Sequence, residues 1–271
     1  MTRSARRILQ TAGAGAAALL ALSACSSSGD SSSTSDPSVS TDAAKKLSGT
    51  VTVFAAASLK ESFTALGRDF ERAHPGTKVT FSFGGSDTLA AGITGGAPAD
   101  VFAAASPKTM AVVTDAGDVS GAPATFARNQ LEIATLPGNP DSVTSLEDLT
   151  RSGLKVVLCD TSVPCGAAAQ KALDAAKLEL TPVSYEQDVK SALTKVVLKE
   201  ADASVVYRTD VLAAGDKVAG VEFPESAEAV NDYPIALLKD APNVEAAKGF
   251  IAFVHSSEGR KVLTGAGFIE P

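Results

Sequence analysis

Short apolar segments rich in β-branched residues alternate along this chain with segments whose apolar residues recur every three or four positions. The first apolar segment, Thr50–Ala56, predicts a strand buried on both faces. A helical pattern then runs to His74-Pro75-Gly76, and further strands over 78–83 and 99–104 flank a helix from 86 to about 93. Because the connections are short, these strands must be parallel and joined by right-handed crossovers. The sequence therefore predicts an α/β fold.

A second unit of the same kind begins near Asn129. It contains predicted strands over 130–136, 154–159 and 203–207, and predicted helices over 145–149, 166–177 and 187–197. After Asp232 the apolar segment YPIALLK leads to helical patterns over 244–255 and 258–263. Two α/β units suggest two lobes around a cleft, and ligands of such sheets bind beyond the carboxyl ends of the strands.

The N-terminus has the layout of a secretory signal peptide. Arg3, Arg6 and Arg7 precede an apolar run over 11–22 that is too short to span a bilayer. The sequence Leu-Ser-Ala-Cys that ends at Cys25 resembles a bacterial lipobox, which implies cleavage after residue 24 and lipidation of Cys25. We therefore expect a signal peptide over 1–24 and a lipid-anchored protein on the extracytoplasmic face of the cell membrane.

The composition of the rest limits the partners of the folded part. Residues 26–40 contain nine Ser, which is typical of a flexible tether, and we extend that tether over 25–48. Loss of the leader would change the net charge from −7 to −10. An acidic chain with 5% aromatic residues and no Trp is unsuited to nucleic acid, whose backbone it repels and whose bases it cannot stack on.

Cys159 and Cys165 are the only cysteines of the expected folded part. In an oxidising exterior a disulfide between them is favoured, with free thiols and a metal or catalytic role as the alternatives. The chain has only two histidines, His74 and His255, and no CxxC or HExxH motif. We therefore predict no direct protein ligands to a metal.

Five residues fall at strand ends or helix starts that should meet in the cleft. They are Ser58, Ser86, Cys165, Val189 and Tyr207. Taken singly, each has an ordinary interpretation: Ser58 has the capping-box spacing with Glu61, Gly84-Gly85 before Ser86 reads as a tight turn, the Val189 side chain fits a core, and Tyr207 fits rim packing.

Taken together, these residues indicate an oxyanion site. Hydroxyl groups and the N–H groups of helix N-termini can hold a dianion without Lys or Arg. Each hydrogen bond to a charged group contributes roughly 1.5–3 kcal/mol, so six or seven of them would give a gross contribution on the order of 10–20 kcal/mol before the costs of binding. That is enough for micromolar or tighter binding despite the negative charge of the chain.

Several stretches carry a resemblance to a known family. They are VTVFAAASLKESF (51–63), FSFGGSDTLA (81–90), GAPADVFAAAS (96–106), FARNQLEI (126–133), SVPCGAAAQKAL (162–173), DVKSAL (188–193) and SVVYRTDV (204–211). In this respect the chain resembles the molybdate-binding periplasmic proteins of ABC importers, the ModA family. Many relatives have Ala where this chain has Cys165, a change that a backbone donor tolerates.

The resemblance implies a two-lobe, type II periplasmic-binding-protein fold with the ligand cleft between the lobes. Lobe 1 would comprise 49–128 plus 232–271 and lobe 2 would comprise 129–231, with hinges near 128–130 and 223–232. It also implies that a monomer without cofactor or enzymatic activity holds molybdate, and also tungstate, for an ABC permease. The ligands would be the hydroxyls of Ser58, Ser86 and Tyr207 and the N–H groups of Cys165 and Val189.

Other functions stay open at this stage. A receptor for sulfate or another tetrahedral oxyanion is the nearest alternative, whereas a phosphate receptor needs a hydrogen-bond acceptor that the five residues do not supply. A secreted serine hydrolase would need a base near Ser58 or Ser86, and a surface adhesion role is the last alternative. We expect Asp87, Asp100 and Asp210 to cap or brace the cleft, because carboxylates would repel a dianion, and Arg208 to be structural.

Overall fold

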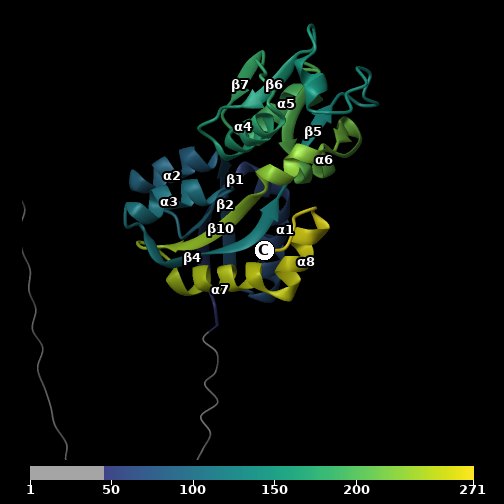
Figure 1. The fold of residues 1–271 in the computed structure, drawn as a ribbon. Coiled ribbons are helices and arrows are strands. Elements are labelled where there is room, and N and C mark those ends of the chain that lie inside the picture. Colours follow the sequence, from purple (N-terminus) through teal and green to yellow (C-terminus); the bar gives the residue numbers. More distant parts are fainter. Residues whose placement is uncertain (1–45) are drawn as a thin grey trace, which may run out of the picture. The chain divides into compact units, whose positions relative to one another are not determined.

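The computed structural model describes residues 46–271, which contain two five-stranded sheets (Figure 1). The spatial order of strands in the first sheet is β2 (Thr77–Gly84), β1 (Gly49–Ala56), β3 (Val101–Ala103), β10 (Asn231–Leu238) and β4 (Val119–Asn129). In the second sheet the order is β7 (Ser184–Glu186), β6 (Val156–Cys159), β8 (Ala203–Tyr207), β5 (Leu131–Thr135) and β9 (Ala219–Val221).

Each sheet combines parallel and antiparallel pairs. Strands β1, β2 and β3 are parallel, and β10 runs antiparallel to both β3 and β4. In the second sheet β6 is parallel to β7 and β8, whereas β5 is antiparallel to β8 and β9. The parallel strands of each sheet therefore direct their carboxyl ends, and the helices that follow them, to one edge.

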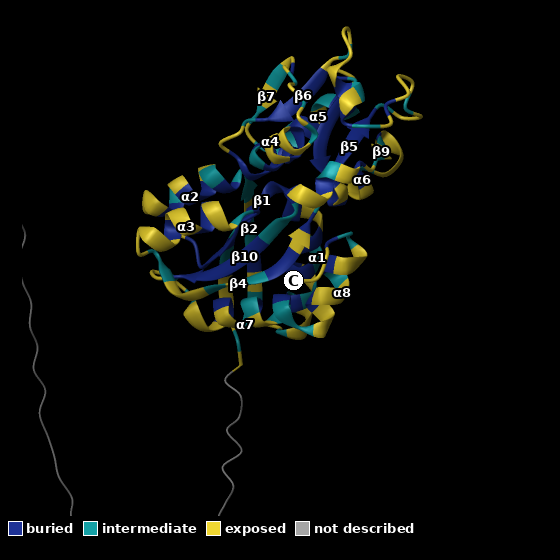
Figure 2. Ribbon diagram, viewed as in Figure 1, coloured by how far each residue is buried: buried dark blue, intermediate teal, exposed yellow. Residues whose placement is uncertain are grey.

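Helices cover both faces of the first sheet, and its strands are the buried layer in Figure 2. On one face α1 (Lys60–Ala73), α7 (Val244–His255) and α8 (Ser257–Gly265) enclose a core in which Phe63, Phe70 and Phe250 make edge-on contacts. On the other face α2 (Ser86–Thr94) and α3 (Pro107–Asp115) cover a smaller core. The second sheet packs against α4 (Pro164–Ala176), α5 (Val189–Val197) and α6 (Arg208–Ala214) around a single core.

The chain crosses between the two sheets twice, at neighbouring places. Strand β4 ends at Asn129 and β5 starts at Leu131, and the return passes from the 3-10 helix η4 (Pro224–Ala229) to β10. Asn129 and Asn231 are directly opposite each other in the β4–β10 pair. The two crossing segments are therefore held side by side.

The predicted α/β class and two-sheet fold are confirmed. Each predicted strand and helix lies within two residues of its expected bounds, although the predicted helix over 145–149 is the 3-10 helix η2 (Glu147–Thr150). The capping-box interpretation of Ser58 is wrong. Ser58 lies inside the 3-10 helix η1 (Ala57–Leu59), the N-cap of α1 is Leu59, and no side chain caps that helix.

The predicted signal peptide, the predicted lipid attachment at Cys25 and residues 26–45 of the predicted tether lie outside the described residues. Within 46–271, no helix combines the length and apolar character needed to span a bilayer.

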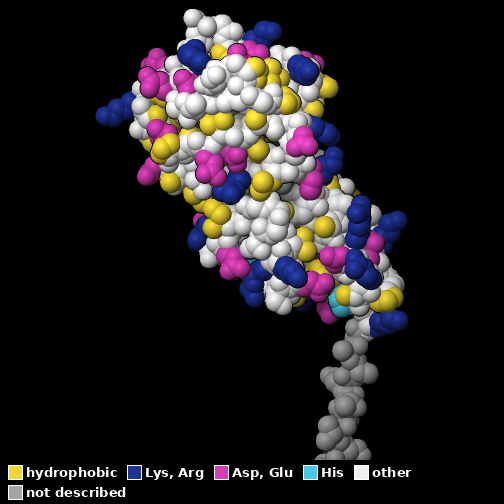
Figure 3. Space-filling model, turned by 90° about the vertical axis from the view of Figure 1, so that its right-hand side faces the viewer, with side chains coloured by type: hydrophobic (Ala, Val, Ile, Leu, Met, Phe, Trp, Pro, Cys, Tyr) yellow, Lys and Arg dark blue, Asp and Glu magenta, His cyan; other side chains and the backbone are white. Residues whose placement is uncertain are grey.

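On the face shown in Figure 3, acidic and basic side chains are interspersed and do not gather into a patch of one sign.

Candidate functional site

All five predicted site residues line one small cavity between the two sheets. Its volume is about 20 Å³. The first-sheet side supplies Ser58 and Ser86, and the second-sheet side supplies Cys165, Val189 and Tyr207. The remaining lining residues are Ala56, Ala57, Gly84, Gly85, Ala105, Val163, Pro164 and Asp188.

Four helix N-termini point their first turns at this cavity. Ser58 belongs to η1, Ser86 is the first residue of α2, Cys165 follows Pro164 at the start of α4, and Val189 is the first residue of α5. The first N–H groups of a helix have no partner inside the helix, and its dipole favours an anion at that end. The convergence therefore produces a site for negative charge without a cation.

Local sequence explains which N–H groups are available. The Asp188 carboxylate accepts from the N–H groups of Lys190 and Ser191 at 2.8 and 2.9 Å, which leaves the Val189 N–H uncapped. At the start of α4, Pro164 has no N–H, so Cys165 carries the first donor of that helix. Both backbone donors assigned from the sequence are thus free of capping side chains.

Each of the three site hydroxyls forms a hydrogen bond with another residue of the protein. Ser58 Oγ lies 2.9 Å from the hydroxyl of Tyr233, Ser86 Oγ accepts from the Ala105 N–H at 3.0 Å, and the Tyr207 hydroxyl accepts from Asn231 Nδ2 at 2.7 Å. These contacts hold the oxygens at the cavity wall. Each hydroxyl can still make a further hydrogen bond to a ligand.

The hydroxyls lie in a dry environment. Ser58, Ser86 and Tyr207 are 4%, 1% and 1% exposed. Burial raises the pKa of the Tyr207 hydroxyl well above its ordinary value, so this group stays protonated and able to donate. Hydrogen bonds to an anion are stronger in such a site than in water.

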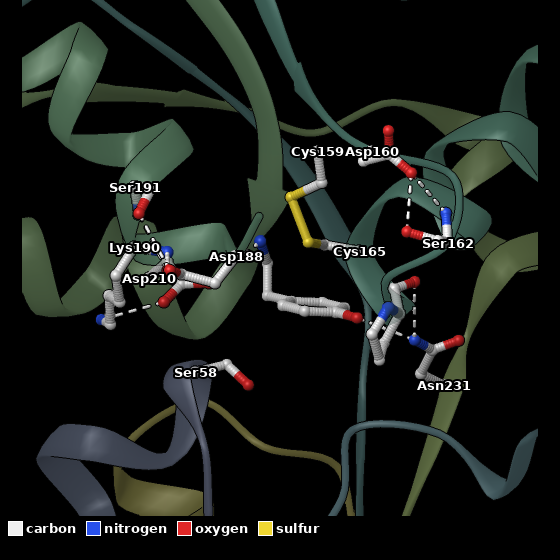
Figure 4. The surroundings of a disulfide bond; sticks show 12 residues. Ser58, Cys159, Asp160, Ser162, Cys165, Asp188, Lys190, Ser191, Asp210 and Asn231 are labelled. Carbon is white, nitrogen blue, oxygen red and sulfur yellow. Dashed lines mark hydrogen bonds and ion pairs between the residues drawn. A yellow bond between two sulfur atoms is a disulfide. The ribbon is translucent and has the colours of Figure 1, made fainter. Parts of the chain in front are cut away.

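A disulfide bond joins Cys159 at the end of β6 to Cys165 at the start of α4, with the Cα atoms 5.8 Å apart (Figure 4). In the loop between them, the Asp160 carboxylate accepts from the N–H and the hydroxyl of Ser162 at 2.8 and 2.7 Å. The backbone N–H of Ser162 lowers the pKa of Asp160. Disulfide and turn together fix the position of the Cys165 N–H.

An ion cluster of Lys190, Asp210 and Glu61 bridges the two sides, and Figure 4 shows its Lys190–Asp210 pair. Lys190 Nζ, on α5, lies 2.9 Å from Asp210 Oδ1 on α6 and 2.8 Å from Glu61 Oε2 on α1. Burial of the Lys190 ammonium lowers its pKa, but the Asp210 carboxylate and Glu61 outweigh that effect and hold the pKa above its ordinary value. The side chain therefore stays charged and links elements of both sheets.

The acidic residues that were expected to brace the cleft do not line the cavity. Asp100 accepts from the N–H groups of Thr52 and Asn243 at 2.7 and 2.6 Å, and Asp210 accepts from the Tyr207 N–H at 3.2 Å. Asp87 lies in the first turn of α2. Arg208 pairs with Glu222 at 3.1 Å at the surface.

Sequence reasoning missed three residues behind the hydroxyls. Asn129, Asn231 and Tyr233 lie on β4 and β10, and Tyr233 is fully buried. Asn129 Nδ2 donates to the Tyr233 hydroxyl at 3.3 Å. Asn129 and Asn231 fall in the two expected hinge segments and Tyr233 begins the stretch YPIALLK, but nothing in these segments indicated a hydrogen bond to a residue about a hundred positions away or to a site hydroxyl.

A cavity of donor groups between two α/β sheets is the arrangement of a solute-binding protein, and residues 51–269 match the family model of bacterial extracellular solute-binding proteins. The molybdate-binding protein ModA of Mycobacterium tuberculosis is 44% identical over 243 residues, which cover 90% of this chain and 92% of that protein. The chain thus belongs to the ModA family of solute-binding proteins.

Solved structures of other binding proteins share the fold, and two of them are informative. The periplasmic molybdate-binding protein of Azotobacter vinelandii matches with a TM-score of 0.71 at 20% identity, covering 82% of this chain and 99% of that one. The sulfate-binding protein SubI of Mycobacterium tuberculosis matches with a TM-score of 0.69, also at 20% identity, covering 81% and 86%. Because both structures are only 20% identical to this chain, they show a shared fold and do not identify the ion that this chain binds.

Proposed function

We propose that this protein captures molybdate, and also the nearly isosteric tungstate, outside the cell and delivers it to an ABC permease. The observation that supports this most is the cavity in which three hydroxyls and the uncapped N–H groups of Cys165 and Val189 converge. The name of the 44%-identical relative, a molybdate-binding protein, supports the choice of ion. The function needs neither a cofactor nor a covalent step.

In this proposal the protein works as a monomer, held at the membrane by a lipid on Cys25. Lobe 1 (49–128 plus 232–271) and lobe 2 (129–231) move about the two crossings next to Asn129 and Asn231. Because each lobe supplies part of the donor set, binding favours the arrangement in which both face the anion. The permease then recognises the closed protein.

A competition titration tests the proposed ligand. We expect molybdate to bind with a Kd below about 1 μM, because several buried donors act together. Tungstate should compete at similar concentrations, and sulfate and phosphate should bind at least about 100-fold more weakly. Isothermal titration calorimetry of the mature protein with the four anions measures this order. Equal affinities for molybdate and sulfate would make the protein a general oxyanion receptor or a sulfate receptor.

Removal of a single hydroxyl tests the assigned donors. Ser86→Ala and Tyr207→Phe are each expected to weaken molybdate binding by about 1–3 kcal/mol, the contribution of one hydrogen bond to a charged ligand. The control is Ser256→Ala, which removes the N-cap of α8 far from the cavity and should leave the affinity unchanged. A hydroxyl whose loss has no effect on the calorimetric Kd does not contact the anion.

A further inference from the structure

The ion cluster of Lys190, Asp210 and Glu61 is close in sequence to proposed ligands on both sides of the cavity. Lys190 follows Val189 in the first turn of α5, on the second-sheet side. Glu61 is three residues after Ser58 in the first turn of α1, on the first-sheet side, and its Oε2 lies 2.8 Å from Lys190 Nζ. The cluster therefore ties together two segments that each carry a donor for the anion.

The two ion pairs of Lys190 differ in what they join. Asp210, in the first turn of α6, belongs to the second-sheet side like Lys190 itself, and its carboxylate also accepts from the Tyr207 N–H at 3.2 Å (Figure 4). Glu61 belongs to the other side. Among the ion pairs of residues 46–271, only Glu61–Lys190 joins the two sides. Lys190 therefore keeps Asp210 as a partner when the sides separate, whereas its contact with Glu61 exists only when they are together.

The Glu61–Lys190 pair is remote from the crossings. In the first sheet, β3 and β10 separate β4 from β1, which leads into α1, and in the second sheet, β6 and β8 separate β5 from β7, which leads into α5. Neighbouring strands are about 4.8 Å apart, so β1 and β7 each lie about 14 Å from the strand at the crossing. Within the described part of the chain, the side-chain hydrogen bonds between the two sides come from Asn129 and Asn231, at the crossings themselves. A rotation about the crossings therefore separates Glu61 from Lys190 more than it separates these other groups.

We propose that Glu61 is a positioning residue for anion binding, whose ion pair with Lys190 forms as the lobes close and slows the release of the anion. The pair favours the arrangement in which Ser58 and Val189 face the anion together. Glu61 is 49% exposed and Lys190 is 20% exposed, so solvent partly screens the pair and its effect on binding is several-fold. This inference rests on the proposed function and adds which contact retains the bound ion.

Glu61→Asp tests the pair without changing the charge, because the shorter side chain withdraws the carboxylate from Lys190. We expect the dissociation rate of molybdate to rise about 3–5-fold, the effect of losing a partly exposed ion pair. The association rate should stay within about two-fold of the wild-type rate, because the anion enters while the lobes are apart and the pair is not formed. Stopped-flow tyrosine fluorescence measures both rates, since Tyr207 lines the cavity.

Glu61→Gln separates the ion pair from simple charge repulsion. If Glu61 acted on the anion only by repelling it, Glu61→Gln would tighten binding and Glu61→Asp would leave it unchanged. If the ion pair holds the lobes closed, both variants release the anion faster, Glu61→Gln by at least about two-fold. Both variants should unfold at nearly the same urea concentration as the wild type, because Asp210 keeps its partner in each of them.

The matched control is Glu200→Gln. Glu200 pairs with Lys195 of α5 at 2.7 Å and is 52% exposed, much like Glu61. This pair lies entirely on the second-sheet side, so its loss should leave both the association rate and the dissociation rate of the anion unchanged.

The rates are measured with whichever of the four anions binds most tightly in the competition titration. A preference for sulfate would thus end the molybdate proposal, and the rates for sulfate would then test the ion pair. An unchanged dissociation rate in Glu61→Asp, or tighter binding in Glu61→Gln, would overturn the inference, and so would an equally fast release in Glu200→Gln. A wild-type protein that binds none of the four anions would overturn the proposed function and this inference with it.

Discussion

Lys190→Met is expected to lower the free energy of unfolding by about 3–5 kcal/mol, the cost of removing one partner from a buried ion pair. The Asp210 carboxylate is fully buried, and its contacts are the Lys190 ammonium at 2.9 Å and the Tyr207 N–H at 3.2 Å. Without the ammonium, Asp210 keeps an uncompensated charge or takes up a proton. Urea denaturation monitored by circular dichroism measures the change.

The same helix provides a matched control. Lys195 pairs with Glu200 at 2.7 Å, but both side chains are exposed, so Lys195→Met should cost no more than about 1 kcal/mol. Glu61→Gln removes the other carboxylate that pairs with Lys190. Glu61 is 49% exposed and its loss leaves Asp210 paired, so its effect on unfolding should also stay within about 1 kcal/mol. A Lys190→Met effect no larger than these two would show that Asp210 does not depend on Lys190.

The cluster also predicts a pH dependence. The pKa of Lys190 is raised above its ordinary 10.5, so its contribution to stability is complete below that value and is lost as the pH rises through the folded-state pKa. The difference in unfolding free energy between wild type and Lys190→Met should therefore be constant from about pH 7 to 9 and shrink above about pH 10.5. A difference that already shrinks near pH 8 would contradict the raised pKa.

The alternation of strands and helices was enough to predict which five residues meet at the cavity. In a parallel sheet, strand ends and the helix starts that follow them share one edge. Ser58, Ser86, Cys165, Val189 and Tyr207 occupy such places, so their meeting follows from local pattern and topology. Their assignment as anion ligands is a proposal, which the single-hydroxyl variants test.

The hydrogen bonds of β4 and β10 that support the site hydroxyls could not be predicted in the same way. Strand β4 contains Gly121 and Pro123, and its pairing with β10 has register shifts, so its sequence lacks the regular alternation of a strand. Strand β10 is apolar over most of its length, a pattern that fits a buried helix as well as a strand. The pairing of Asn129 with Asn231 is a long-range contact that neither local sequence encodes.

The Ser58 error has a related cause. The spacing of Ser58 and Glu61 satisfies a capping box, but a 3-10 turn places Ser58 inside a helical segment, where its Oγ meets the Tyr233 hydroxyl. Lys190 was overlooked because a charged residue in the first turn of an amphipathic helix usually faces solvent. In both cases a buried partner from a distant strand or helix overrides the local preference.

Gly85→Ala is expected to weaken molybdate binding by at least about 100-fold, or about 3 kcal/mol, with little effect on stability. A Cβ at Gly85 would lie 2.6 Å from the carbonyl oxygen of Gln187, which precedes α5 on the other side of the cavity, and 2.7 Å from Asp87 Oδ1. The Asp87 side chain can turn away. The Gln187 carbonyl cannot move without displacing Asp188 and Val189, and with them the donors of the second-sheet side.

The backbone at Gly85 has φ −58° and ψ 133°, which alanine adopts without strain, so the free energy of unfolding should change by at most about 1 kcal/mol. The control is its neighbour, Gly84→Ala, whose Cβ would meet only the Leu89 side chain at 3.8 and 3.9 Å and should change the affinity no more than a few-fold. Calorimetry gives the two affinities and urea denaturation the two stabilities. A large loss of affinity in Gly85→Ala but not in Gly84→Ala would mean that anion binding requires the close contact between Gly85 and the Gln187 carbonyl. Similar affinities in the two variants would show that the donors reach the anion without this approach.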